Sequence, residues 1–176
     1  MTADIKLYNN MDDLLDGSAR EILDKRFLVA YTPFPKLLSL EERMHKRVYA
    51  LITDSIVIGN PAKLYQALGE SVQNLFQHNS PAVRRVRIYY DQEKRSIIGI
   101  FPFNSKKTSA EEYISKMEQA RAIAVNEGLG ELVMRDDINE RLPYGSVILL
   151  GIKELKEIGI TMDGGKPYFF FDYGIN

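Results

Sequence analysis

Residues 83–101 read VRRVRIYYDQEKRSIIGIF, and this stretch has the pattern of a β-hairpin. Successive side chains of a strand point to opposite faces, so alternate residues share a face. One expected face is apolar and the other carries arginine and tyrosine: Val86, Ile88 and Tyr90 against Arg85, Arg87 and Tyr89. The polar segment DQEK, residues 91–94, would form the turn, and SIIGIFPF, residues 96–103, would return as the second strand.

Helical spacing of apolar residues predicts four helices around this hairpin. Capping boxes mark two of the starts, at Ser39 and Ser109, and a proline near the first helical position marks a third. A possible short strand, FLVAYT, follows the first helix. The expected helices cover residues 11–25, 39–54, 60–78 and 109–128.

The C-terminal part of the sequence is rich in strand patterns. Residues 146–152, SVILLGI, are almost continuously apolar, as in a strand covered on both faces. Residues 153–159 suggest a short helix or turn, and residues 159–174 suggest a hairpin around an Asp-Gly-Gly turn. Helices and antiparallel strand pairs are thus mixed without a βαβ rhythm, which predicts an α+β fold with a mainly antiparallel sheet and about four amphipathic helices.

The chain has 176 residues, a normal size for one domain, so we expect residues 1–176 to form a single globular domain. It contains no cysteine, which excludes disulfides and thiolate chemistry. The first residues lack the pattern of a secretory signal, and no apolar run approaches the roughly 20 residues of a membrane span. We therefore expect a cytoplasmic protein that makes no contact with membranes.

Recognisable catalytic motifs are missing from the sequence. Its two histidines fall in different expected helices, so we expect neither a metal site nor a cofactor. The segment RDDINER contains an acidic cluster that is flanked by arginines. Such carboxylates can bind a hard cation or transfer protons, or they can form an ion-paired loop. The cluster consists of Asp136, Asp137 and Glu140.

The hairpin region has an unusual charge. Residues 81–107 contain seven basic and two acidic residues, whereas the whole chain has a formal net charge of −1. This region can contact phosphate groups and stack bases, form a protein interface, or remain a solvated or internally paired face. The residues considered for anion binding or for an interface are Arg84, Arg85, Arg87, Tyr89, Lys94 and Arg95.

Three consecutive phenylalanines, Phe169, Phe170 and Phe171, cannot all point to one side of a strand. Either both faces are covered within the domain or a second subunit covers one of them. The leading functional hypothesis is a non-catalytic interaction or assembly protein that associates with itself. Two alternatives remain: an anion- or nucleic-acid-binding protein that uses the basic hairpin 83–101, and an enzyme whose carboxylate–arginine site is not recognisable from one sequence.

Overall fold

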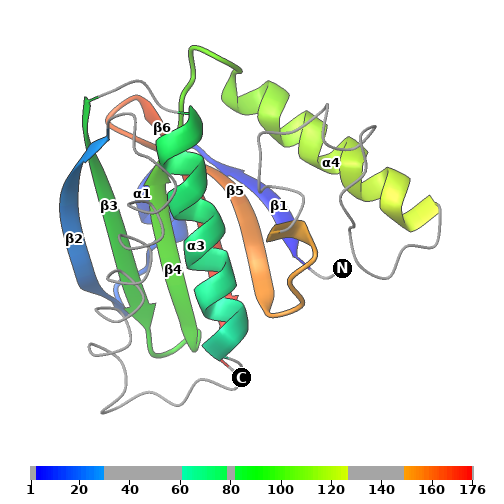
Figure 1. The fold of residues 1–176 in the computed structure, drawn as a ribbon. Coiled ribbons are helices and arrows are strands. Elements are labelled where there is room, and N and C mark those ends of the chain that lie inside the picture. Colours follow the sequence, from blue (N-terminus) through cyan, green and yellow to red (C-terminus); the bar gives the residue numbers. More distant parts are fainter. Residues whose placement is uncertain (1–2, 30–60, 79–81, 127–148, 176) are drawn as a thin grey trace.

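The structure is a computed structural model that describes residues 3–29, 61–78, 82–126 and 149–175. These residues contain one six-stranded sheet with helices in front of it and behind it (Figure 1). The strands are β1 (Asp4–Tyr8), β2 (Ala19–Val29), β3 (Ala82–Asp91), β4 (Ser96–Pro102), β5 (Leu155–Asp163) and β6 (Lys166–Gly174).

The strand order in the sheet is β1-β5-β6-β4-β3-β2. The terminal strand β1 runs parallel to β5, and the other neighbouring strands run antiparallel. The predicted α+β class with a mainly antiparallel sheet is therefore confirmed. Both predicted hairpins are present, β3–β4 and β5–β6.

The described residues contain three helices rather than about four: α1 (Met11–Leu14), α3 (Pro61–His78) and α4 (Ala110–Asn126). The helix expected at residues 39–54 lies outside the described residues. In Figure 1, α3 crosses the front of the sheet, α4 lies beside β1, and α1 lies behind the sheet. Within the described part of the chain, no helix has both the length and the apolar character needed to cross a membrane.

The two long helices begin where the sequence predicts. Pro61 starts α3, whose apolar stripe is buried at Leu64, Leu68, Val72 and Leu75. The Ser109 hydroxyl oxygen accepts a hydrogen bond from the backbone N–H of Glu112 at 3.1 Å, as expected of an N-cap residue. The apolar face of each helix packs against the front of the sheet.

Two segments that were expected to be helical belong largely to strands. Residues 11–25 do not form one helix, because the chain turns after α1 and residues 19–29 enter the sheet as β2. The Asp16 carboxylate accepts from the backbone N–H of Ser18 at 2.9 Å, which stabilises this turn. Of residues 153–159, expected to form a short helix or turn, only Lys153 and Glu154 lie in a turn, because β5 begins at Leu155 and forms ladder bonds to β6.

Further differences concern the predicted strands. β1 was not expected from the sequence. The predicted strand at 146–152 is wrong where it can be seen, because Leu149 and Leu150 lie in a helical turn. The strand predicted at residues 27–32 coincides over residues 27–29 with the end of the longer strand β2, and its other residues lie outside the described ones. Tertiary pairing thus decides several segments whose local patterns were ambiguous.

The apolar residues of the sheet form one core on each face. In front, Phe169 and Phe171 pack in the large core under α3 and α4, with 6% and 0% of their surface exposed. Behind, Phe170 is fully buried with Leu14 of α1 and Ile98 and Ile100 of β4. Both faces of β6 are therefore covered within a single chain.

Gly159 allows β1 to pair closely with β5, because a Cβ at this position would collide with the backbone carbonyl oxygen of Lys6. We expect Gly159→Ala to displace β1 and to lower the free energy of unfolding by about 1–3 kcal/mol, the usual cost of overpacking. Urea unfolding measures this loss. Gly17→Ala is the matched control, since nothing lies within 4 Å of its added Cβ. Equal stability of the two variants would contradict the close approach.

Candidate functional site

The basic residues of the β3–β4 hairpin are divided between two faces and a turn. Alternation along β3 places Arg85, Arg87 and Tyr89 on the rear face of the sheet, the face that α1 partly covers. Arg84 lies on the front face and is half-buried. Arg95 is exposed in the turn, with a φ of 53°. The predicted grouping of Arg85, Arg87 and Tyr89 on one face is present, but these side chains are not freely exposed.

Arg85 is paired with a carboxylate from the neighbouring strand. Its Nε and Nη2 atoms donate to the two carboxylate oxygens of Asp24 in β2, at 2.8 and 2.6 Å. This two-bond geometry matches the planar edge of the guanidinium to the carboxylate. The bond from Arg85 lowers the pKa of Asp24 below its ordinary value. Both side chains are about one-third exposed, so the pair contributes at most about 1 kcal/mol to stability.

Arg87 is buried, with only 4% of its side chain exposed. Its Nη1 atom donates to Oδ2 of Asp163, at the end of β5, over 2.9 Å. The guanidinium carbon lies 4.9 Å from the centre of the Tyr168 ring, in cation–π contact. A guanidinium enclosed in this way is unsuited to the open phosphate-contacting surface considered for the hairpin.

Tyr89 is half-buried beside these arginines. Its hydroxyl donates to the Glu21 carboxylate over 3.4 Å, which is a long and weak hydrogen bond. Burial raises the pKa of Tyr89 above its ordinary value. The ring borders the small rear core rather than standing free for base stacking.

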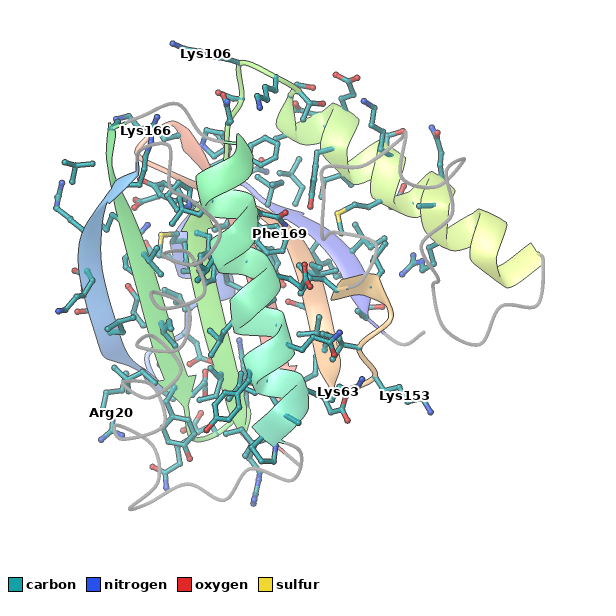
Figure 2. All side chains as sticks on the ribbon, viewed as in Figure 1. Arg20, Lys63, Lys106, Lys153, Lys166 and Phe169 are labelled. Atoms are coloured by element: carbon teal, nitrogen blue, oxygen red, sulfur yellow. The ribbon has the colours of Figure 1, made fainter. Side chains whose placement is uncertain are left out.

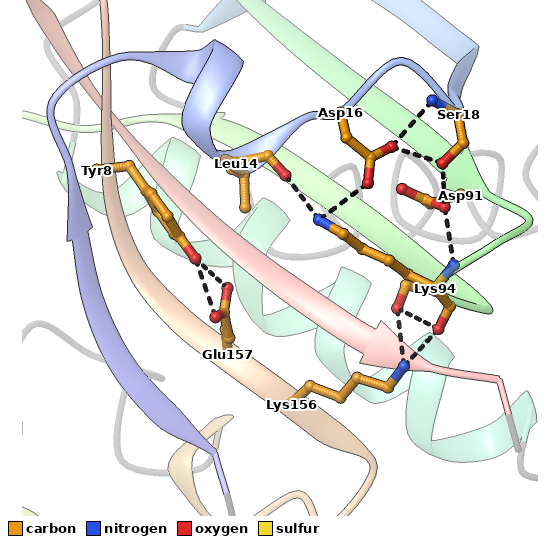
Figure 3. A network of polar contacts seen from close by, with 9 residues as sticks. Tyr8, Leu14, Asp16, Ser18, Asp91, Lys94, Lys156 and Glu157 are labelled. Atoms are coloured by element: carbon orange, nitrogen blue, oxygen red, sulfur yellow. Dashed lines mark hydrogen bonds and ion pairs between the residues drawn. The ribbon is translucent and has the colours of Figure 1, made fainter.

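Lys94 joins the hairpin turn to α1, as Figure 3 shows. Its Nζ atom donates to the backbone carbonyl of Leu14 at 3.3 Å and lies 3.5 Å from the Asp16 carboxylate. The last carbonyls of a helix have no partner within the helix, so the lysine satisfies one that would otherwise need water. Lys94 thus fastens the loop after α1 to the sheet.

Asp91 is fully buried, and it holds the same turn through hydrogen bonds. Its Oδ1 atom accepts from the backbone N–H of Lys94 at 2.9 Å and lies 2.6 Å from the Ser18 hydroxyl. That hydroxyl also lies 2.5 Å from Asp16. It has one proton and donates to one carboxylate at a time. Bonds from Ser18 lower the pKa of Asp16 to about 2.

Lys156 of β5 approaches the turn from the other side (Figure 3). Its Nζ atom donates to the backbone carbonyl of Lys94 at 2.6 Å and to the hydroxyl of Ser96 at 3.1 Å. The turn is therefore anchored both to the loop after α1 and to β5. These contacts fix the position of the basic turn.

Two carboxylates face each other across β5 and β6, since Glu157 and Asp172 are partners in register. The Tyr8 hydroxyl lies 2.9 and 2.7 Å from the two carboxylate oxygens of Glu157, and it donates its one proton to this carboxylate. Burial and this hydrogen bond raise the pKa of Tyr8. Asp172 has 5% of its surface exposed, and burial is the main reason why its pKa is raised. The charge of Glu157 acts in the same direction.

The positive charge of the hairpin is thus largely balanced inside the domain. Three of its cationic side chains, Arg85, Arg87 and Lys94, pair with carboxylates that come from outside the hairpin. These carboxylates belong to Asp24, Asp163 and Asp16. Of the alternatives open from the sequence, this geometry favours an internally paired face.

A different feature is open to solvent. A hollow of about 280 Å³ lies where β2 and β3 meet the turn, and Ser18, Arg20, Tyr90 and Gln92 line it. The guanidinium carbon of Arg20 lies 5.8 Å from the centre of the Tyr90 ring. Arg20 is exposed, and it forms no ion pair with a carboxylate among the described residues. Figure 2 shows Arg20 at the lower edge of the sheet.

The hollow was missed from the sequence because Arg20 was assigned to a helix. In a strand, Arg20 is the register partner of Tyr90, and this pairing creates the arginine–ring contact. The acidic cluster Asp136, Asp137 and Glu140 lies outside the described residues. In the described ranges, no three histidine or carboxylate side chains gather in a way that could hold a metal ion. No family model, curated protein or solved structure matches the chain.

The pKa of Asp172 is raised and that of Asp16 is lowered, so the two carboxylates should change the stability of the fold with pH in opposite directions. Because the pKa of Asp172 is raised in the folded state, this group favours folding below its ordinary pKa of 3.8, and the contribution is lost as pH rises through the raised value. We therefore expect Asp172→Asn to be more stable than the wild type at pH 7, with the difference vanishing below 3.8. Urea unfolding as a function of pH measures it.

Asp16→Asn is the matched control with the opposite sign. The pKa of Asp16 is lowered to about 2, so its contribution is present above 3.8 and is lost as pH falls through 2. This variant should be less stable than the wild type at pH 7 and equal to it in strong acid. If Asp172→Asn were instead less stable than the wild type across the whole pH range, the cost assigned to burying Asp172 would be disproved.

Proposed function

We propose that this chain is a non-catalytic interaction protein that binds an acidic side chain of a protein partner in the hollow formed by Ser18, Arg20, Tyr90 and Gln92. The observation that carries the proposal is the exposed guanidinium of Arg20 beside the Tyr90 ring. The N–H bonds of a guanidinium lie in its plane, so they can meet a carboxylate while the ring contacts its face.

The size of the hollow favours one side chain over a cofactor. Its volume of about 280 Å³ is at the lower limit of ligand pockets, which typically measure about 300–1,000 Å³. The exposed amide of Gln92 adds N–H donors at the border of the hollow. Arginine and tyrosine are also the residue types that most often dominate binding energy in protein interfaces.

The charge-reversal variant Arg20→Glu tests this proposal. Wild type and variant serve as baits for proteins from the native source at the same salt concentration. We expect at least one protein to be captured about ten-fold less by the variant, the effect of losing roughly one charge-assisted hydrogen bond. Since Arg20 is exposed, urea unfolding should differ from the wild type by about 0.5 kcal/mol or less.

Lys106→Glu is the matched control for the change in net charge. Lys106 is exposed in the segment before α4 and lies at the opposite end of the molecule in Figure 2. It should leave capture unchanged. If both variants lose the same proteins equally, or if neither loses any, the hollow is not the binding site.

Self-association is a separate part of the proposal. The three phenylalanines that suggested a covering subunit are buried within one chain, so they no longer support it. What supports it now is that the chain offers acidic side chains of its own to the hollow. These are exposed in the first turns of α1 and α4 and further along α4: Asp12, Asp13, Glu111 and Glu118.

We expect wild-type protein to associate weakly, because one small contact site buries far less than the roughly 1,200–2,000 Å² of a stable interface. Light scattering at tens of micromolar should show an average mass above that of the monomer, and Arg20→Glu should reduce it. A strictly monomeric wild type would exclude a second copy as the partner. The partner that binds in the hollow would then have to be a different protein.

A further inference from the structure

Two arginines on the same face of β3, two positions apart, differ in one atomic detail. The edge of Arg85 formed by Nε and Nη2 is filled by both oxygens of Asp24, at 2.8 and 2.6 Å. The corresponding edge of Arg87 has no hydrogen-bond acceptor among the described residues, although both nitrogens are buried. Asp163 accepts from Arg87 only through the third nitrogen, Nη1, at 2.9 Å.

The strand register explains why the Nε and Nη2 atoms of Arg87 have no carboxylate partner among the described residues. Asp24 is the register partner of Arg87, yet its carboxylate is directed to Arg85. One carboxylate cannot fill both edges. Asp163 approaches from the β5–β6 turn and reaches only Nη1.

The guanidinium of Arg87 is held firmly in this position. Its carbon lies 4.9 Å from the centre of the Tyr168 ring, and the residue has 4% of its side chain exposed. On β5, the register partner of Tyr168 is Thr161, whose buried hydroxyl oxygen also has no partner among the described residues. Buried donors without acceptors are costly, so each one calls for a physical explanation, such as an ordered water or a bound ion.

We propose that the Nε–Nη2 edge of Arg87 is an oxyanion-binding point that takes one carboxylate or phosphate group. The two parallel N–H bonds of this edge match two oxygens of such a group. The Arg85–Asp24 pair, two residues away, is an example of the same geometry within this protein. The site lies on the rear face of the sheet and is independent of the hollow at Arg20.

The charges beside this edge are compatible with an incoming anion, because the cations Arg85, Arg87 and Lys166 outnumber the carboxylates of Asp24 and Asp163. The Nε and Nη2 atoms themselves are shielded from solvent, so an anion reaches them only when the β5–β6 turn beside Asp163 moves aside. The side chain of Asp163 is 41% exposed, so this turn borders solvent. Gly164 and Gly165 form this turn with positive φ angles of 58° and 79°.

The test uses inorganic phosphate and acetate, titrated separately into wild-type protein, with sodium chloride at matched ionic strength as the control. The first readout is the NMR signal of the Arg87 Nε–H group. The Nε–H signal of Arg85 in the same spectrum is the internal control, because its edge is already occupied. We expect a saturable shift for Arg87 and little change for Arg85.

The second readout is thermal unfolding of wild type, Arg87→Lys and the matched variant Arg85→Lys. Lysine keeps the positive charge but lacks the two-bond edge. At a ten-fold excess over Kd, the anion should raise the Tm of the wild type by about 3–6 °C. Arg85→Lys should keep this rise, and Arg87→Lys should lose it.

Each outcome either identifies the class of anion that binds or overturns the proposed site. A response to phosphate alone, to acetate alone or to both supports the site and names the class of oxyanion. Equal responses in Arg87→Lys and wild type, or NMR shifts no larger than those in sodium chloride, overturn it. If Arg87→Lys does not fold, the wild-type NMR titration alone decides. Loss of partner binding at Arg20 would leave this result unaffected.

Discussion

The fold depends on covering β6 on both faces. Three consecutive buried phenylalanines need apolar neighbours in front and behind, because adjacent strand residues point to opposite sides. In front, α3 and α4 cover Phe169 and Phe171; behind, α1 covers Phe170 through Leu14. The short helix α1 therefore completes the core, and the contacts of Lys94 and Asp91 with the loop that follows it hold it against the sheet.

The length of α1 determines the chemistry of the rear face. Among the described residues, the four-residue helix α1 covers only the patch around Phe170 on this face. The polar groups on the rest of the face need other partners. Charged and polar side chains fill it as cross-strand pairs, such as Arg85 with Asp24 and Tyr8 with Glu157. Pairing with carboxylates on neighbouring strands and turns thus accounts for the basic residues Arg85 and Arg87 of β3. It does not require an external polyanion.

Strong local patterns allowed much of the fold to be predicted from the sequence. Both hairpins and the long helices α3 and α4 have clear periodicity, and caps or turn residues mark their boundaries. Residues 19–25 were predicted to be helical although they form part of β2. Their apolar residues, Ile22 and Leu23, are adjacent, and this spacing fits both a helix and a strand. A bulge between Glu21 and Leu23 breaks the alternation that would have revealed a strand. Arg20 was misplaced for the same reason, so its contact with Tyr90 was hidden.

The net charge of the hairpin region suggested an open basic surface, and this inference was misleading for a different reason. A formal net charge records how many groups are present, whereas binding depends on which donors still lack acceptors. Asp24, Asp163 and Asp16 lie far from the hairpin in sequence, and the sheet and its turns bring them to it. Register then directs one carboxylate to Arg85 rather than to Arg87. Equivalent arginines in the sequence therefore become different in the fold: one is saturated, and the other retains a buried edge with donors to offer.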